Sequence, residues 1–105
     1  MIKPDKNNKS PLAPDNFPDL MAIDGVKIST EATGVKYKDR DDLLLIEFVE
    51  GTQVAGALTR SLTCSHAVNW CKRNLPAGSA RALIVNAGNA NAFTGKLGET
   101  AVNEC

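Results

Sequence analysis

Two apolar runs in the middle of the chain carry the strongest signal for β-structure. Residues 43–49 are apolar at nearly every position, and residues 53–59 follow after the connection Glu50-Gly51-Thr52. A glycine in so short a connection suits a positive φ angle, so the pattern predicts a β-hairpin. Because the first run lacks polar alternation, we expect it to be buried on both faces, with a helix against one of them.

Two further strands are predicted on either side of this hairpin. Residues 20–30 alternate in part, and Gly25 among them suits a bulge or a close backbone approach. Residues 83–85 predict a short, buried strand that ends at Asn86. The charged residues 36–42 are typical of a solvated loop.

Helical spacing appears in two segments. Ser65 is a suitable N-cap for a helix with Val68, Cys71 and Leu75 on one side, ending near Gly78. A second helix is predicted from Thr94 or Gly95, with its apolar side formed by Leu97, Ala101 and Val102. No stop signal follows it, so we expect the chain to end within an element.

The length of 105 residues allows one small domain or part of a larger one. Residues 1–19, rich in Lys, Asn, Asp and Pro without periodicity, are interpreted as a flexible leader before a domain in residues 20–105. Twelve basic and twelve acidic residues give a formal net charge of zero, which disfavours nucleic acid and anionic membranes as partners.

The sequence shows little sign of a membrane span, a targeting signal or a disulfide framework. The longest purely apolar stretches, such as residues 43–46, are far shorter than the roughly 20 residues of a membrane span, and we find no secretory signal. Three cysteines without Cys-x-x-Cys spacing indicate reduced thiols and a cytoplasmic location. Packing or no role at all is the simplest interpretation of Cys64, Cys71 and Cys105.

The most unusual segment is NAGNANAFTG, residues 86–95, between a predicted strand and a predicted helix. It matches neither a P-loop nor a G-x-G-x-x-G motif. Two interpretations remain open: a tight turn held by asparagine side chains, or a site where the Thr94 hydroxyl and the Gly95 amide face the oxyanion of an acyl-transfer intermediate.

The stretch RALIVNAGNANAFTG, residues 81–95, resembles the signature of the ornithine acetyltransferase family of arginine biosynthesis. The likeness extends over residues 18–105. Two positions depart from the pattern: residues 55–61 read AGALTRS where the family tends to have a phenylalanine before the threonine, and Phe93 replaces a small residue or cysteine. Neither departure touches Thr94 or Gly95.

This resemblance implies an α/β (α+β), layered, sandwich-like fold of the N-terminal-nucleophile type, incomplete here. The family's enzymes cleave their own chain before a threonine, which carries an acetyl group from N-acetylornithine to glutamate. Thr94 and Gly95 then correspond to the oxyanion hole. The nucleophilic threonine has no counterpart in these residues, so we expect an N-terminal fragment of the α chain, inactive by itself.

The family also implies partners. An α2β2 assembly with the remaining α- and β-chain segments is expected, with acetyl-coenzyme A as a possible substrate and no metal or prosthetic group. Whether the enzyme has one activity or both stays open. Two alternatives remain: a free-standing module that binds a small anion through residues 86–95, or a related self-processing amidohydrolase that shares the nucleophile chemistry but not this signature.

Other side chains have simpler interpretations. His66 has no second metal ligand nearby and suits a capping or surface role, and Trp70 suits a core position. Lys96 is either solvated or steers a carboxylate substrate. Three asparagines of the loop either orient substrate or satisfy the loop backbone: Asn86, Asn89 and Asn91.

Overall fold

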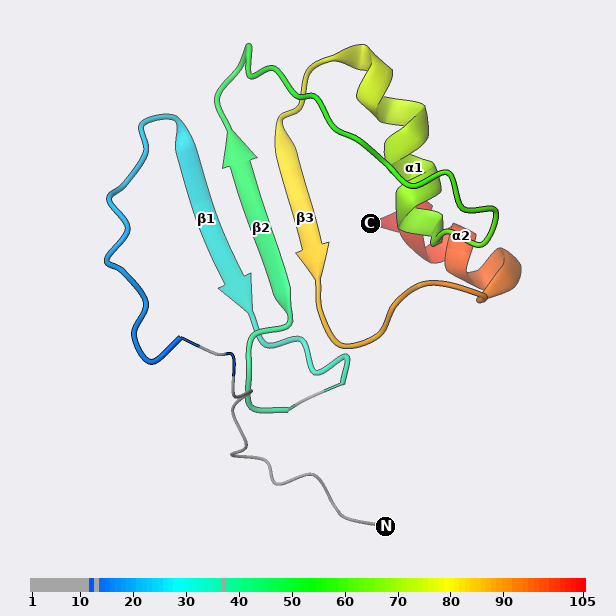
Figure 1. Ribbon diagram of the computed structural model, residues 1–105, viewed down its shortest axis with the longest axis horizontal. Coiled ribbons are helices and arrows are strands. Elements are labelled where there is room, and N and C mark those ends of the chain that lie inside the picture. The colour runs from blue at the N-terminus through cyan, green and yellow to red at the C-terminus, as the bar shows by residue number, and fades with distance from the viewer. Residues whose placement is uncertain (1–11, 13, 37) are drawn as a thin grey trace.

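The computed structural model describes residue 12, residues 14–36 and residues 38–105. The elements follow in the order β1 (Val26–Glu31), β2 (Leu43–Phe48), α1 (His66–Asn74), the 3-10 turn η1 (Leu75–Ala77), β3 (Ala82–Asn86) and α2 (Gly95–Glu104) (Figure 1). One antiparallel sheet has the strand order β1-β2-β3, so the chain is α+β. Most of the predicted leader lies outside the described residues.

The strand register separates the two faces of the sheet. Residues directly opposite each other in antiparallel strands share a face, and Ile46 lies opposite both Ile28 and Leu83. Apart from Thr30, this face is apolar throughout: Val26, Ile28, Leu44, Ile46, Phe48, Leu83 and Val85. The other face is mixed, with Lys27 opposite Glu47.

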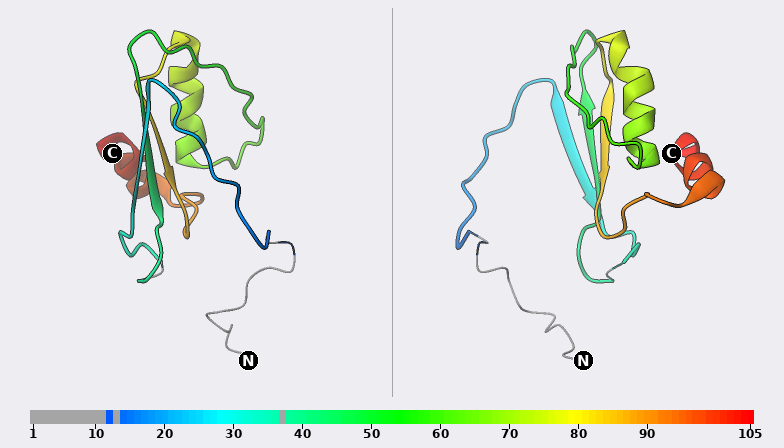
Figure 2. Two further views of the ribbon diagram at one scale, coloured as in Figure 1. Left: turned by 90° about the vertical axis from the view of Figure 1, so that its left-hand side faces the viewer. Right: turned by 45° about the vertical axis from the view of Figure 1, so that its right-hand side comes forward.

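No helix in the described part of the chain covers either face of the sheet. Helices α1 and α2 contact each other and lie on the β3 side of the sheet (Figures 1 and 2). No hydrophobic residue in the described part of the chain is buried, and Ile28 is 64% exposed. The chain exposes 9597 Å², well above the roughly 5,700 Å² expected of a folded monomer of this mass. The expected burial of residues 43–49 and of β3 is therefore wrong within this chain.

The predicted hairpin is also wrong. Residues 53–59 form no strand, and only Gln53 makes an isolated bridge, to Ser79. Glycine and alanine are weak strand formers, and a Cβ at Gly56 would lie 3.3 Å from a methyl group of Leu75. The segment therefore passes close to the end of α1, while the more apolar β3 pairs with β2.

The first strand is shorter than predicted, because it begins after a turn. Gly25 has a φ of 82°, and its carbonyl accepts from the Val49 amide at 3.0 Å. A Cβ at Gly25 would lie 2.9 Å from a Val49 methyl group. This confirms the close backbone approach expected at the glycine, whereas residues 20–24 lie outside the strand.

Helix α1 follows its sequence signals closely. The Ser65 hydroxyl accepts from the Val68 amide at 3.3 Å, and Gly78 ends the following turn with a φ of 69°. The side predicted to face inward is half-buried: Val68, Cys71 and Leu75. Trp70 is 42% exposed, so its predicted core position is wrong within this chain. On α2, Leu97 of the predicted apolar side is 84% exposed.

Candidate active site

Residues 87–94 connect β3 to α2, and their first half is fixed to the turn that precedes β2. The Ala87 amide donates to the Asp42 carbonyl at 2.8 Å, and the Asn89 side chain donates to the Val35 carbonyl at 3.4 Å. Asn86 donates to the Asn89 carbonyl at 3.3 Å. The structure therefore uses Asn86 and Asn89 to satisfy loop backbone, one of the two roles considered for them.

Asp42 organises that neighbouring turn. The residue is 4% exposed, and its carboxylate accepts from the Thr33 hydroxyl and amide, both at 2.7 Å, and from the Val35 amide at 2.8 Å. The hydroxyl bond from Thr33, followed by the amide bonds, holds the pKa of Asp42 below its ordinary value, against the opposing effect of desolvation. Interpreting residues 36–42 as entirely solvated is wrong at Asp42, whose carboxylate is bound by Thr33 and Val35 from the preceding segment.

Thr94 ends the loop in an exposed position between two residues with positive φ. Phe93 has a φ of 58° and Gly95 a φ of 59°. A left-handed conformation is unfavourable for a bulky residue such as Phe, and the Phe93 side chain is 87% exposed. Although Thr94 is the N-cap residue of α2, its side chain does not cap a helix amide. Its hydroxyl donates to Asn91 Oδ1 at 2.5 Å.

Asn91 connects the loop to both helices. Its Nδ2 donates to the Gly98 carbonyl in α2 at 2.8 Å, and its backbone carbonyl accepts from the His66 amide at the start of α1 at 3.1 Å. Gly98 is buried, and a Cβ there would collide with Thr94 Oγ1 and Asn91 Oδ1. Sequence reasoning missed Gly98, although a glycine inside a predicted helix was the available signal.

The two residues predicted to form an oxyanion hole lie side by side at the start of α2. Gly95 is its first residue, is exposed, and has open space where a Cβ would project. The first amides of a helix have no intrahelical acceptor, so a compact ligand can approach the Gly95 N–H closely. Lys96, the next residue, is exposed as well, and its choice between steering and solvation stays a prediction.

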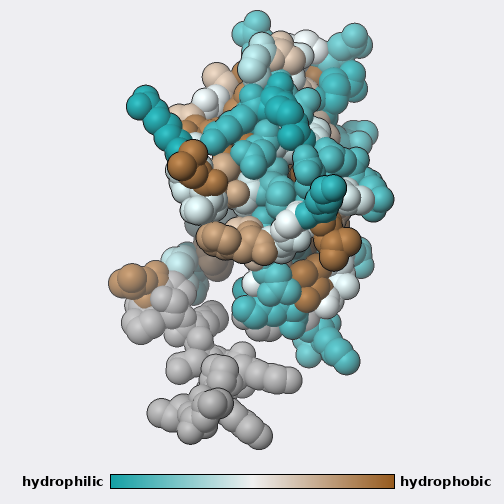
Figure 3. Space-filling view, turned by 90° about the vertical axis from the view of Figure 1, so that its right-hand side faces the viewer, coloured by the Kyte–Doolittle hydropathy of each residue, from teal (hydrophilic) through white to brown (hydrophobic). Residues whose placement is uncertain are grey.

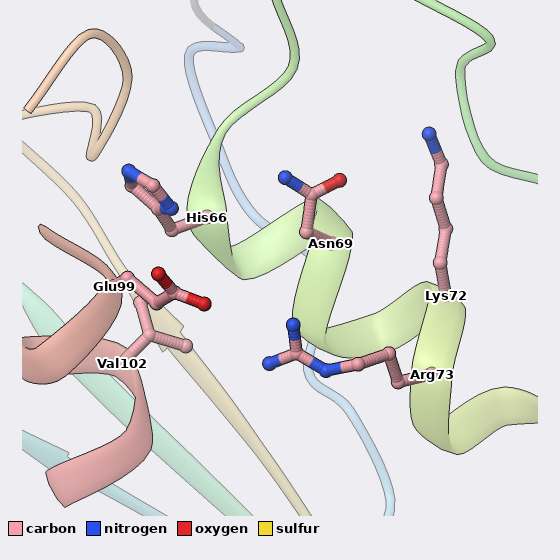
Figure 4. A pocket seen from close by; sticks show the side chains of 6 residues that line it. All are labelled: His66, Asn69, Lys72, Arg73, Glu99 and Val102. Carbon is pink, nitrogen blue, oxygen red and sulfur yellow. The ribbon is translucent and has the colours of Figure 1, made fainter. Parts of the chain in front are cut away.

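A separate cavity of about 360 Å³ lies between the helices (Figure 4). It is lined by His66, Asn69, Lys72, Arg73, Glu99 and Val102. The Arg73 guanidinium donates to Asn103 Oδ1 at 3.4 Å. The surface on this side is mostly polar and interrupted by apolar patches (Figure 3). His66 thus contributes its backbone to the loop and its side chain to the cavity.

Neither a metal cluster nor a membrane span is found in the part of the chain that the structure describes. Among those residues, no three His, Cys, Asp or Glu side chains are placed to hold a metal ion. None of the described helices has the length and apolar character needed to cross a bilayer. Cys64, Cys71 and Cys105 are unpaired in this structure, and their reduced state in the cell stays a prediction.

Comparison with known proteins identifies the family. The family model of the ArgJ family matches residues 27–105. The chain belongs to the ArgJ family. The "Arginine biosynthesis bifunctional protein ArgJ" of Mesorhizobium japonicum is 55% identical over 89 residues, which cover 85% of this chain and 22% of that protein. The proteins of the same name from Brucella suis and Bradyrhizobium diazoefficiens are 53% and 51% identical over 92 residues.

This finding confirms the resemblance seen in residues 81–95, which lie within the matched ArgJ region together with all of the loop and α2. The chain spans about a fifth of the length of the curated ArgJ relatives that it matches.

Proposed function

We propose that this chain supplies the oxyanion-binding loop of an acetyltransferase that moves an acetyl group from N-acetylornithine to glutamate. The observation that carries the proposal is the pair Thr94 and Gly95, adjacent and exposed at the start of α2. The relatives' names, which describe bifunctional proteins of arginine biosynthesis, support the pathway and a second activity.

The chemistry follows from the donors. Attack on an acetyl carbonyl produces a tetrahedral intermediate whose oxygen bears a full negative charge. The Thr94 hydroxyl and the Gly95 amide both donate to that oxygen, and the positive end of the α2 dipole lies behind them. A threonine in another part of the enzyme is the proposed nucleophile and carries the acetyl group between the two substrates. Acetyl-coenzyme A is a substrate, the acetyl donor of the second reaction, and the proposed mechanism uses no metal or prosthetic group.

The uncovered apolar face of the sheet supports a larger assembly. The sheet has an apolar face with no cover, and no hydrophobic residue among those described is buried. Such a sheet requires another layer for stability. We propose that the remaining α- and β-chain segments supply it, in a cytoplasmic α2β2 enzyme with the layered N-terminal-nucleophile fold. The chain alone is then inactive.

A substitution at Thr94 tests the proposal in the full-length enzyme that carries this sequence. Thr94→Val removes the hydroxyl at nearly constant volume. We expect kcat to fall by roughly a hundredfold to a thousandfold, the range for one oxyanion donor, with little change in KM. Thr100→Val, at an exposed position on the same helix, is the matched control and should keep its kcat.

Two outcomes would contradict the proposal. One is an unchanged kcat in Thr94→Val. The other is a cooperative unfolding transition of the 105-residue chain by itself, together with acetate binding that depends on Thr94, which would favour the anion-binding module.

A further inference from the structure

The Thr94 hydroxyl already donates a hydrogen bond within this structure. A hydroxyl has one proton to donate, and Thr94 donates it to Asn91 Oδ1 at 2.5 Å. The orientation of the Asn91 amide is fixed by its other end, because Nδ2 donates to the Gly98 carbonyl at 2.8 Å. Turning the amide over would place Oδ1 against that carbonyl, and two acceptors would face each other. Asn91 must therefore accept from Thr94 and cannot donate to it.

We propose that Asn91 is a positioning residue that holds the Thr94 proton on a neutral acceptor until an oxyanion forms. This inference rests on the proposed function of Thr94. A substrate carbonyl and the Asn91 amide oxygen are both neutral acceptors, so exchanging one for the other gains little in the ground state. A charged oxygen accepts roughly twice as strongly, so the exchange becomes favourable only as negative charge develops.

This exchange breaks no covalent bond. The O–H of Thr94 turns from Asn91 Oδ1 toward the oxyanion and turns back when the charge collapses, and the proton stays on Oγ1 throughout. Because the donor interaction is gained in the transition state and not with bound substrate, it raises kcat and leaves KM unchanged.

The surroundings of Asn91 suit such a role. The side chain is half-buried, and its backbone carbonyl accepts from the His66 amide at 3.1 Å. Because Gly98 has no Cβ, Asn91 Oδ1 and Thr94 Oγ1 can occupy the space beside it. The acceptor is thereby held by both helices, while Thr94 itself stays exposed to a substrate.

A double-mutant cycle in the full-length enzyme tests the inference. Asn91→Ala should lower kcat about tenfold or more with KM unchanged, since misplacing a catalytic group by about 1 Å can reduce the rate a hundredfold. In the Thr94→Val background, Asn91→Ala should cause no further loss. If the two losses multiply, Asn91 acts independently of the hydroxyl and the inference is wrong, although Thr94 keeps its role. An unchanged kcat in Thr94→Val overturns both.

A second variant, Asn91→Asp, adds the pH dependence of kcat as a measurement that separates a positioning role from a purely structural one. In Asn91→Asp, the protonated carboxyl has one O–H for the Gly98 carbonyl and one oxygen for Thr94, as the amide does, whereas the ionised form has no donor. The ratio of its kcat to that of the parent should therefore rise as the pH is lowered. A ratio independent of pH would overturn the inference, even where Asn91→Ala folds poorly.

Discussion

At the scale of single residues, the site depends on small and polar side chains whose partners are fixed by geometry. Asn91 accepts from Thr94 and donates to Gly98, so three residues between positions 91 and 98 form one unit. The position of the loop between a strand and a helix that begins at Gly95 could be predicted from the sequence, and the oxyanion role of Thr94 and Gly95 stays a prediction. The role of Gly98 could not be predicted, because it depends on how closely two side chains approach the helix backbone.

Gly98→Ala separates this packing role from helix propensity. Alanine is favoured over glycine inside a helix by about 1 kcal/mol, so propensity alone predicts a more stable α2. A Cβ at this position instead collides with Thr94 Oγ1 and Asn91 Oδ1. We expect kcat of the full-length enzyme to fall about tenfold or more. Steady-state kinetics measure this loss, with Ala101→Gly, at an exposed position of the same helix, as the comparison variant. An unchanged kcat in Gly98→Ala would contradict the packing argument.

Asp42 adds a pH-dependent contribution to stability. Its folded pKa is lowered by the Thr33 and Val35 bonds, so the unfolded state binds the proton more readily. The stabilisation is therefore fully present above the unfolded value of roughly 3.9 and is lost as the pH falls through the folded pKa. Asp42→Asn should be less stable than the parent at pH 6, and the difference should shrink below about pH 4.

Urea unfolding of the full-length enzyme between pH 3 and 6 measures this difference. Asp24→Asn, at an exposed position, is the matched control. A constant difference for Asp42→Asn across the range would show that its carboxylate is not the titrating group.

At the scale of elements, local signals predicted local structure well. The cap at Ser65, the turn at Gly78 and the β-branched residues of β3 indicated α1 and β3 correctly. The hairpin prediction was wrong because β2 pairs with β3 and not with residues 53–59. These two candidate partners are separated in the sequence by α1. That choice depends on which segment has the side chains to pair, and no short window of sequence contains both candidates.

At the scale of the whole molecule, the sheet has an apolar face that the chain itself leaves open. The continuous apolar run in β2 predicted burial on both faces, yet the helices lie beside the sheet on the β3 side (Figure 2). The sequence pattern and the exposed surface agree if another segment of the enzyme covers this face. The pattern therefore describes the environment of β2 in the proposed assembly better than its environment in this chain.

Ile28 lies on this apolar face and is 64% exposed, so its substitution tests whether the face is covered. In the full-length enzyme, Ile28→Ser should lower the free energy of unfolding by about 2 kcal/mol, the contribution of one fully buried aliphatic side chain. Lys27→Ser changes the neighbouring residue on the opposite face and should stay within about 0.5 kcal/mol. Chemical denaturation of both variants gives the two values. If Ile28→Ser is tolerated as well as Lys27→Ser, the apolar face is solvent-exposed in the enzyme and the proposed second layer lies elsewhere.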